Sequence, residues 1–343
     1  MQQGQAKVSV VILCWNGRKF IEEFLPSLLQ FQSADSEIIV ADNASTDDSV
    51  AYVRQHFPSV KIIQLEKNFG FAGGYNHAIK QITSEYIVLI NQDVAVTENW
   101  LPPMLEMMER DEQIGAVQPR IRSHLQRSRF EYAGAAGGWI DRFGYTFCRG
   151  RVFDAIEEDT NQYNTPAEIF WASGACMLTR KKTYETLGGL DEDFFSHMEE
   201  IDLCWRMKNQ GYKIMYCPGS VVYHLGGGSL PQGNPFKTYL NYRNNLIMLT
   251  KNLPEKDVRR IVYSRVLLDG ISAIRSLLRG YPHDVSSIWK AHGEFRKGLS
   301  KWKSKRTGNE KDFFSLTGVY RGSIVREFFF RKKRKFREIV NES

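Results

Sequence analysis

Four short clusters of polar residues and glycines stand out in the first hundred residues, each directly after an apolar run. They are Trp15-Asn16-Gly17, Asp42-Asn43-Ala44-Ser45, the stretch from Asn68 to Asn76, and Asn91-Gln92-Asp93. In a doubly wound α/β sheet, ligands bind where the carboxyl ends of strands meet loops and helix N-termini. One such cluster could reflect turn chemistry alone, because Asn, Asp, Ser and Gly dominate turns. Four clusters at one edge of one sheet favour a ligand-binding site.

A second group of chemically active side chains lies between Ser196 and Arg206, where the sequence reads SHMEEIDLCWR. A carboxylate in such a segment can act as a general base that takes a proton from an attacking hydroxyl. Ser196 and Glu199 have the S-x-x-E spacing of a helix capping box. Asp202 stands four residues before Arg206, which is the spacing of a helix-surface ion pair. Neither interpretation uses Glu200.

The elements that must position these residues follow from the apolar pattern. Short β-branched runs alternate with helical patterns, which is typical of a parallel sheet built from βα units. Strands are predicted at 8–13, 37–41, 60–65 and 86–90, and helices at 18–31, 45–56 and 73–82. Ser45 is predicted to cap the second of these helices, with Asp48 at the capping-box position.

The second half of the chain has a looser pattern. Residues 130–153 are rich in glycine and aromatics and predict a loop or hairpin, followed by strands at 169–178 and 213–223 and helices at 181–187 and 199–210. From about residue 236 the chain is predicted to be helical and increasingly basic. We therefore expect an α/β catalytic domain over 1–250, with halves at 1–120 and 121–250, and a basic helical extension over 251–343.

The composition limits the partners and the compartment. A formal net charge of +7 favours acidic partners such as nucleotides or anionic lipid, and no recognised nucleic-acid-binding module is present. The five cysteines are scattered without C-x-x-C spacing, which predicts reduced thiols rather than a disulfide framework. The N-terminus lacks a signal-peptide pattern, and no stretch approaches the roughly 20 apolar residues that span a bilayer. These features predict a cytoplasmic protein, peripheral on the inner face of the cell membrane.

A family resemblance joins these motifs. The runs VSVVILCWNG, DNASTDDS, NFGFAGGYN and LINQDV, followed in order by WASGACMLTR, GGLDEDFF, HMEEIDLCWR and YHLGGGS, resemble family 2 glycosyltransferases with the GT-A fold, over roughly residues 7 to 250. In detail the chain looks closest to the rhamnosyltransferase-like members that build surface polysaccharides. The resemblance implies inverting transfer of a sugar from a nucleotide-diphosphate donor, a dTDP- or UDP-sugar, to a glycan or lipid-linked glycan.

The resemblance also implies a donor site. Its predicted residues are Trp15, Asn16, Asp42, Asn68, Gly70, Gly73, Asn76, Gln92 and Asp93. Asp42 can accept the N3–H of uracil or thymine, although a helix-capping or Asx-turn role is the structural alternative. The glycines let the backbone approach the donor and open a helix whose N–H groups favour anions.

A divalent metal, Mg²⁺ or Mn²⁺, is implied as the cofactor. The family usually carries a D-x-D-like motif whose last carboxylate binds the metal that bridges the diphosphate, whereas this chain reads Asn91-Gln92-Asp93. One or two protein ligands together with substrate phosphates can hold such an ion. The resemblance assigns these ligands to Asp93 and to His224, which precedes a triple glycine.

On the acceptor side, the resemblance places the general base at Glu200, the second acid of a Glu-Glu pair where the family has Glu-Asp. The other predicted acceptor-side residues are Trp171, Ser173, Gly174, Glu199 and Asp202. Trp171 could stack a sugar ring or be a core aromatic. Arg243 could touch the diphosphate or flank a helix.

Two C-terminal segments could meet a membrane. Residues 261–278 have a mixed amphipathic pattern that suits either packing on the catalytic domain or membrane contact. The run from Phe328 to Arg337 combines three phenylalanines with a basic cluster and predicts contact with an anionic lipid surface. Two other functions remain open: a degenerate transferase-like scaffold or sugar-binding protein, motivated by the incomplete D-x-D, and a nucleotidyltransferase, which lacks its phosphate-binding signature here.

Overall fold

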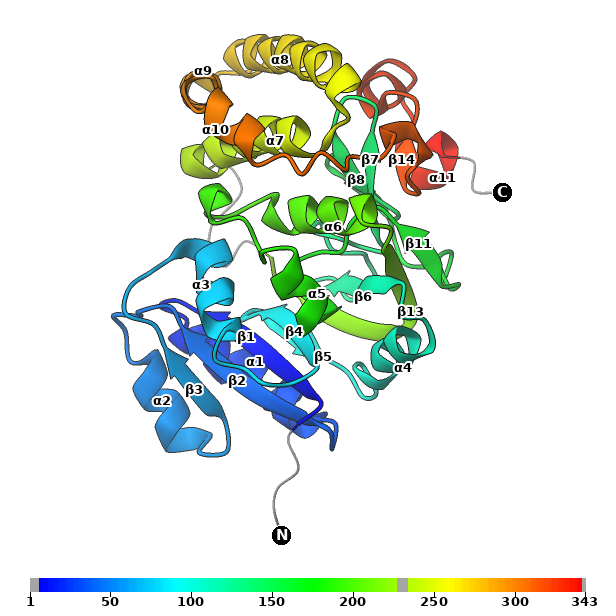
Figure 1. The fold of residues 1–343 in the computed structure, drawn as a ribbon. Coiled ribbons are helices and arrows are strands. Elements are labelled where there is room, and N and C mark those ends of the chain that lie inside the picture. The colour runs from blue at the N-terminus through cyan, green and yellow to red at the C-terminus, as the bar shows by residue number, and fades with distance from the viewer. Residues whose placement is uncertain (1–5, 227–233, 341–343) are drawn as a thin grey trace.

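The computed structural model describes residues 6–226 and 234–340. Within this part of the chain, the main sheet contains nine strands in the order β11-β13-β6-β12-β4-β1-β2-β3, and β5 pairs with β13 (Figure 1). These strands are β1 (Val8–Cys14), β2 (Ser36–Asp42), β3 (Lys61–Gln64), β4 (Tyr86–Asn91), β5 (Val94–Val96), β6 (Ile114–Ser123), β11 (Ala167–Ile169), β12 (Cys176–Arg180) and β13 (Lys213–His224). The α/β class predicted from the sequence is confirmed.

The first four strands bring their carboxyl ends to one edge. β1 is parallel to both of its neighbours, with Cys14 opposite Asp42 on β2 and Leu13 opposite Asn91 on β4. β3 extends this parallel part beside β2. The polar clusters that follow these strands therefore lie along one edge, as predicted. β12 runs antiparallel between β4 and β6, which makes the whole sheet mixed.

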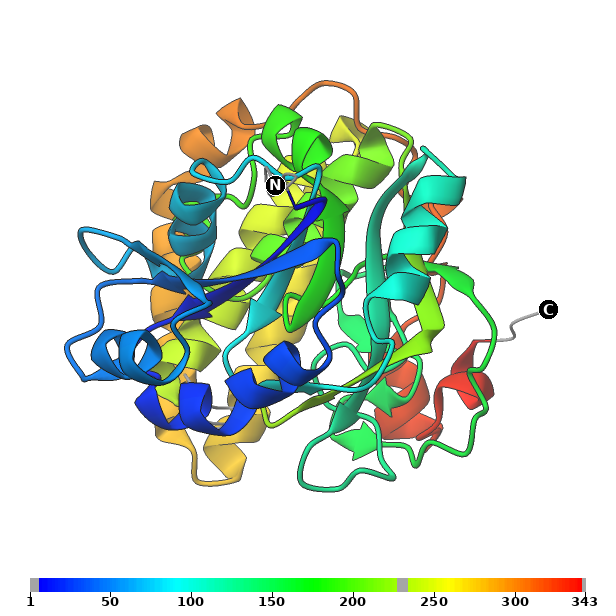
Figure 2. The same cartoon turned by 90° about the horizontal axis from the view of Figure 1, so that it is seen from below.

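Helices cover both faces of the sheet, because side chains alternate along each strand. Val10 and Ile12 face a core that includes α1 and α4, whereas Val11 faces the opposite core, which includes α3, α6 and α7 (Figure 1, Figure 2). The helices are α1 (Arg18–Gln30), α2 (Ser49–His56), α3 (Gly70–Ile79), α4 (Pro102–Arg110), α5 (Lys181–Thr186), α6 (Glu199–Asn209), α7 (Pro235–Asn252), α8 (Glu255–Leu278), α9 (Pro282–Lys297), α10 (Leu299–Ser304) and α11 (Phe336–Ile339). Short helical turns occur at η1 (Glu192–Phe194), η2 (Phe313–Ser315) and η3 (Arg326–Phe330).

Two of the predicted elements are placed wrongly. The helix predicted from Ser45 begins at Ser49, because the Ser45 hydroxyl accepts a hydrogen bond from the Asn16 N–H instead of capping a helix. The strand predicted over 169–178 is two strands, β11 and β12, which pair with different neighbours and are separated by residues 170–175.

The predicted hairpin over 130–153 is part of a second sheet, which the C-terminal segment completes. This sheet has the order β10-β9-β8-β7-β14. Its strands are β7 (Gly138–Asp141), β8 (Thr146–Cys148), β9 (Arg151–Val152), β10 (Ala155–Ile156) and β14 (Val319–Tyr320). The last forty residues are thus not all helical as predicted: β14 runs parallel to β7, and the buried Phe336 packs against Trp139 and Phe147.

The helices of the described residues are too short or too polar to cross a bilayer. All five cysteines are unpaired and buried.

Candidate active site

The loops after β1 and β2 are joined by hydrogen bonds at the sheet edge. Asn16, with a φ of 48°, donates its backbone N–H to the Ser45 hydroxyl over 2.9 Å, and its side-chain oxygen accepts the Thr46 N–H over 2.7 Å. Trp15 lies beside this junction with 47% of its surface exposed. Its backbone nitrogen lies 3.4 Å from the side-chain oxygen of Gln92. Three predicted donor-side residues therefore meet at one edge.

Asp42 lies at the end of β2 and is 3% exposed. One of its carboxylate oxygens accepts the Ser45 N–H over 3.0 Å, which is the contact that the Asx-turn alternative predicts. The role of Asp42 in base recognition stays a prediction. The neighbouring Asn43 is a residue that the sequence analysis did not single out. Its side-chain amide donates to the Asn68 side chain and the Gly70 carbonyl, and its oxygen accepts the Phe69 N–H, which ties the loops after β2 and β3 together.

The glycines of α3 allow close packing against the segment that precedes α6. Gly70 has a φ of 72°, and a Cβ at this position would lie 2.5 Å from the Phe195 ring. A Cβ at Gly73 would lie 2.8 Å from the Phe69 Cβ. The N–H groups of Phe71 and Ala72 donate to the Phe195 carbonyl. The first turn of α3 is therefore already hydrogen-bonded to protein, which does not support its predicted use as an anion-binding helix end.

Asn76, a predicted donor-binding residue, has its side-chain hydrogen bonds used within the protein, which does not support that role. Its amide group donates to the Leu190 carbonyl over 2.7 Å and to the Glu192 carboxylate over 3.2 Å. Its oxygen accepts the Tyr184 hydroxyl and the Leu190 N–H. Two donors and two acceptors are all that an asparagine side chain has. Asn76 instead fastens α3 to the segment before η1.

Asp93 and His224 meet across the β5–β13 pairing. Asp93 Oδ1 lies 3.2 Å from His224 Nε2, and both side chains are nearly buried. Glu131 contacts the other ring nitrogen, with its Oε2 3.3 Å from His224 Nδ1. Burial alone would lower the pKa of His224, but the two carboxylates raise it to about 10. Glu131 was missed because it lies in the glycine- and aromatic-rich excursion, where no motif marks it.

Asp93 and His224 fit a divalent cation that has only a few protein ligands. A carboxylate oxygen and an imidazole nitrogen 3.2 Å apart can both contact one ion, provided that the ion displaces the proton that His224 Nε2 holds against Asp93. Glu131 cannot share that ion, because it contacts the opposite nitrogen. Accordingly, no group of three or more His, Cys, Asp or Glu side chains within the described ranges is arranged to hold a metal. Any ion here would need the donor's phosphates to complete its coordination.

The start of α6 differs from the predicted capping box. The residue before the helix is Met198, in the left-handed conformation with a φ of 73°, and no side chain caps the helix. Phe195 and His197 also have positive φ values. Such a strained segment persists only where its surroundings hold it. Asn244 of α7 does so by donating its amide to the carbonyls of Phe194, Ser196 and His197.

Without the capping box, Glu199 and Glu200 are two adjacent acids with no partner for one oxygen each. The Oε2 atom of each carboxylate is buried without a hydrogen bond to the described residues. Burial raises the pKa of Glu200 to about 7. Burial, together with the charge of Glu200, raises the pKa of Glu199 well above its ordinary value. Glu199 is 3% exposed, whereas Glu200 is only partly buried.

Gly174 and Phe71 adjoin Glu200. A Cβ added to Gly174 would lie 3.2 Å from the Phe71 ring and 3.7 Å from the Glu200 Cβ. The backbone of Gly174 also hydrogen-bonds to the Glu200 carboxylate and lowers its pKa against the effect of burial. The structure therefore brings the predicted base next to one predicted acceptor-side residue.

Three other predicted acceptor-side residues have structural roles. Trp171 is 4% exposed, packs on Gly138 and donates its indole N–H to the Trp139 carbonyl, so it is a core aromatic rather than a stacking platform. The Ser173 hydroxyl donates to the Ala133 carbonyl and accepts a backbone N–H. Asp202 is fully buried.

Asp202, predicted on the acceptor side, is buried and ion-paired, which does not support that role, and its predicted pairing with Arg206 is present at 2.8 Å. The pair is buried rather than on the helix surface. Lys251 and Asn252 of α7 also contact the Asp202 carboxylate. Burial would raise the pKa of Asp202, but the charges of Lys251 and Arg206 hold it below its ordinary value.

Arg243 flanks its helix, the second of its two predicted roles. Its guanidinium donates to the carbonyls of Asp193 and Phe194 and lies over the Tyr239 ring.

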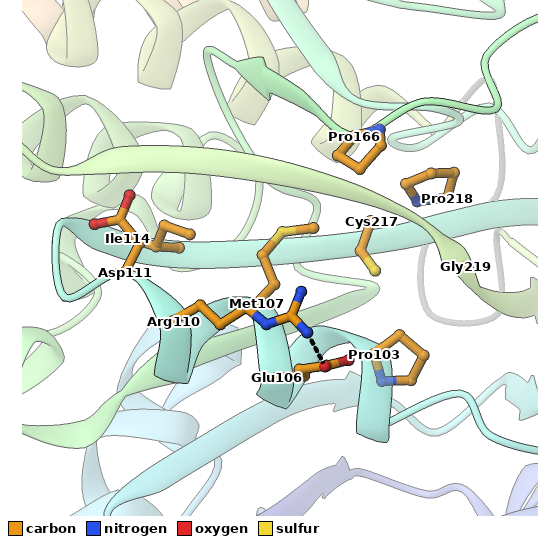
Figure 3. Close-up of a pocket in the computed structure, with 10 residues that line it drawn as sticks. All are labelled: Pro103, Glu106, Met107, Arg110, Asp111, Ile114, Pro166, Cys217, Pro218 and Gly219. Carbon is orange, nitrogen blue, oxygen red and sulfur yellow. Dashed lines mark hydrogen bonds and ion pairs between the residues drawn. The ribbon is translucent and has the colours of Figure 1, made fainter.

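A separate hollow of about 380 Å³ lies between α4 and the irregular part of β13, lined by residues such as Met107, Arg110 and Cys217 (Figure 3). None of the predicted site residues lines it, so we do not assign the chemistry to this hollow.

The site thus combines a strand edge with polar loops, a carboxylate–histidine pair and a partly buried acid of raised pKa. The sequence model described as glycosyl transferase family 2 matches residues 9–188, just over half of the chain. The chain belongs to glycosyl transferase family 2. It is therefore a glycosyltransferase, as the sequence resemblance predicted.

Curated relatives of this glycosyltransferase include two bacterial enzymes. An N-acetylglucosaminyl-diphospho-decaprenol L-rhamnosyltransferase from Mycobacterium tuberculosis is 26% identical over 232 residues, which cover 63% of this chain and 75% of the relative. A poly-beta-1,6-N-acetyl-D-glucosamine synthase from Staphylococcus epidermidis is 24% identical over 222 residues, which cover 64% of this chain and 50% of the synthase.

Solved structures confirm the GT-A fold. GalNAc-T7, crystallised with UDP, GalNAc and Mn²⁺, superposes with a TM-score of 0.58 at 13% identity and covers 88% of this chain and 58% of that one. S. aureus TarS 1-349 in complex with UDP-GlcNAc gives a TM-score of 0.56 at 16% identity, covering 88% and 84%. Identities this low show the fold alone.

Proposed function

We propose that this glycosyltransferase inverts the anomeric centre as it transfers a sugar from a dTDP- or UDP-sugar to a glycan or lipid-linked glycan, in the synthesis of a surface polysaccharide. The observation that carries this proposal is Glu200. It is an acid of raised pKa with a carboxylate oxygen that has no hydrogen bond to the described residues, next to Gly174, which also lies beside Phe71 of α3. The printed name of the mycobacterial relative, a rhamnosyltransferase for a diphospho-decaprenol-linked sugar, supports the acceptor class.

In this mechanism Glu200 takes the proton of the acceptor hydroxyl. The freed oxygen attacks the anomeric carbon, and the bond from that carbon to the nucleotide diphosphate breaks with its electron pair. The proton remains on Glu200 until it exchanges with solvent. A pKa near 7 suits this task, because a base works best when its pKa lies near the working pH.

The donor's diphosphate would leave at the strand edge. Asp93 and His224 would hold Mg²⁺ or Mn²⁺, whose charge offsets the negative charge that develops on the leaving diphosphate. Asp42 would accept the N3–H of the pyrimidine base, and Trp15 and Asn16 would line the same edge. The Mn²⁺ in the GalNAc-T7 structure and in that of a Pyrobaculum calidifontis mannosyltransferase with GDP-Man supports the choice of cofactor.

The proposal places the enzyme in the cytoplasm, peripheral on the inner face of the membrane, where nucleotide sugars and a lipid-linked acceptor would meet. Only part of the C-terminal run that is predicted to contact lipid is exposed. Phe328 is 4% exposed, and Arg331 and Lys333 pair with Glu327. Phe330, by contrast, is 79% exposed.

The test is to incubate the full chain with UDP-, dTDP- and GDP-sugars, with Mn²⁺ or with EDTA, and with an acceptor that carries a lipid-diphosphate sugar. We expect turnover of a dTDP- or UDP-sugar that EDTA abolishes, and NMR of the product should show an inverted anomeric centre. A product with the donor's anomeric configuration would refute the single-displacement mechanism. Turnover of a GDP-sugar alone would refute the assignment of the donor.

A further inference from the structure

Helix α8 has two apolar faces, of which one packs against the protein and the other is exposed within the part of the chain that the structure describes. The inner face contains Val258, Ile261 and Ala273, all buried. The outer face carries large apolar side chains at the helical spacings of four, four, three and four residues. They are Tyr263, Leu267, Ile271, Ile274 and Leu278, which are between 53% and 82% exposed. The sequence left open whether this helix packs on the domain or meets a membrane, and the structure shows one face packed on the domain and another exposed.

The outer apolar face extends past the end of the helix. Leu277 and Tyr281 are about three-fifths exposed, and Trp289 on α9 is 74% exposed. We call these eight exposed side chains the α8 outer face. Soluble monomers rarely expose a contiguous apolar patch of this kind without a binding function. Figure 1 shows α8 as the outermost helix, at the end of the molecule opposite the strands β1 to β3.

The exposed charges of α8 from Arg259 onward are of one sign, while the neighbouring α9 carries the carboxylates Asp284 and Glu294, which contact residues of α7. Between Arg259 and His283 the exposed charged residues are the arginines 259, 260, 275 and 279. The single carboxylate of that segment, Asp269, is fully buried and paired with Arg265 and His292. Arginines beside apolar side chains, with Tyr and Trp among them, are the composition of helices that lie in the interface of an anionic bilayer.

The helix layer that carries this face also holds the catalytic segment. Thr238 of α7 and Ser276 of α8 both hydrogen-bond to Asp284 at the start of α9. The same α7 contributes Asn244, which holds the carbonyls before Glu199. Helix α7 therefore connects the helices that carry the α8 outer face to the segment before the candidate base. A membrane bound at this face would have a fixed position relative to Glu200.

We propose that the α8 outer face is the surface by which this enzyme docks on an anionic lipid bilayer. The inference deepens the proposed function, since it rests on an acceptor that is carried by a lipid. It also assigns the contact to α8 and α9 instead of to the C-terminal tail, whose Phe328 is buried and whose Arg334 stacks on Phe328.

The experiment is co-sedimentation of the full chain with vesicles of phosphatidylcholine alone or with phosphatidylglycerol. We compare the parent, the double variant Ile271→Glu/Ile274→Glu, the double variant Arg259→Gln/Arg279→Gln, and Phe330→Glu as the matched control for an exposed apolar residue in the tail. The parent should bind the anionic vesicles. The isoleucine variant should lose at least about tenfold in affinity, because two side chains that would insert into the bilayer become charged. The arginine variant should bind more weakly and with less salt dependence, and Phe330→Glu should bind like the parent.

Three results with vesicles would overturn the inference. They are no binding by the parent, equal binding by the parent and the isoleucine variant, or loss of binding in Phe330→Glu alone, which would return the contact to the tail. Sedimentation velocity without vesicles tests a second copy of the chain as the occupant: a parent dimer that the isoleucine variant dissociates would also overturn the inference. All substituted side chains are exposed, so thermal unfolding should be unchanged. Turnover of a soluble acceptor analogue by the isoleucine variant separates this inference from the proposed chemistry, because that activity should persist.

Discussion

Two regions differ in how well their motifs predicted their contacts. One is the strand edge that is predicted to hold the donor, and the other is helix α6, which carries the candidate base. At the strand edge, the predicted residues Trp15, Asn16 and Gln92 meet through direct contacts. On α6, one predicted residue, Asp202, is buried among cations, and the predicted capping box does not form. The carboxyl ends of parallel strands are brought together by the sheet itself, whereas the neighbours of a helix are decided by distant segments.

The largest expected effect comes from the two adjacent acids of α6. Glu200→Gln should lower the transfer rate by about 10²–10⁴, the usual contribution of a general base, with little change in donor affinity. Glu199→Gln should cost little, since its carboxyl is buried with a raised pKa and a glutamine has nearly the same shape. Kinetics at saturating donor decide between them. If Glu199→Gln were inactive and Glu200→Gln active, the base would be Glu199 instead of Glu200.

Glu199 and Glu200 are not distinguished by a capping box. The spacing of Ser196 and Glu199 predicted one, but the helix begins after the left-handed Met198, and no side chain of the described residues caps it. What now separates the two acids is exposure and neighbours. Glu199 is buried, while Glu200 is partly exposed beside Gly174. A left-handed non-glycine residue at a helix start has no sequence pattern, so this detail could not be predicted.

A second effect tests whether Asp202 belongs to the protein core. Asp202→Ala should lower the free energy of unfolding by about 3–5 kcal/mol, because Lys251 and Arg206 would be left buried without their shared carboxylate. Urea denaturation measures this difference. At temperatures where the variant is folded, the affinity for the acceptor should match that of the parent. A variant of normal stability that binds the acceptor poorly would restore the acceptor-side role.

The fold could be predicted further than the site. The order of strands and helices in the first hundred residues was correct because it depends on local hydrophobic periodicity. The buried roles of Asn76 and Trp171 depend on partners 114 and 32 residues away, at Leu190 and Trp139. Glu131 was missed for the same reason, since its partner His224 is distant in the sequence. Motif identity shows where a residue lies but not whether its hydrogen bonds are already used.

A smaller effect tests the donor side of the comparison. Asp42→Ala should weaken binding of UDP by about 5- to 150-fold, which corresponds to one lost buried hydrogen bond. The dependence on Mn²⁺ should not change. Isothermal titration calorimetry with and without the metal measures both. A variant that binds UDP like the parent would leave Asp42 with its contact to Ser45 alone, as an Asx-turn residue.

The smallest effect is the pH dependence of the rate, and it tests the two regions together. Burial raises the pKa of Glu200 to about 7, and only the ionised carboxylate can accept the proton of the acceptor hydroxyl. The rate should therefore rise with pH through 7 and level off above it, with a loss of about tenfold at one pH unit below that pKa. An ordinary glutamate would place the same limb near pH 4.3 instead. The residual activity of Glu200→Gln should show no such limb, whereas Glu199→Gln should keep it. A limb that survives unchanged in Glu200→Gln would assign the titration to another group and remove the chemical argument for this base.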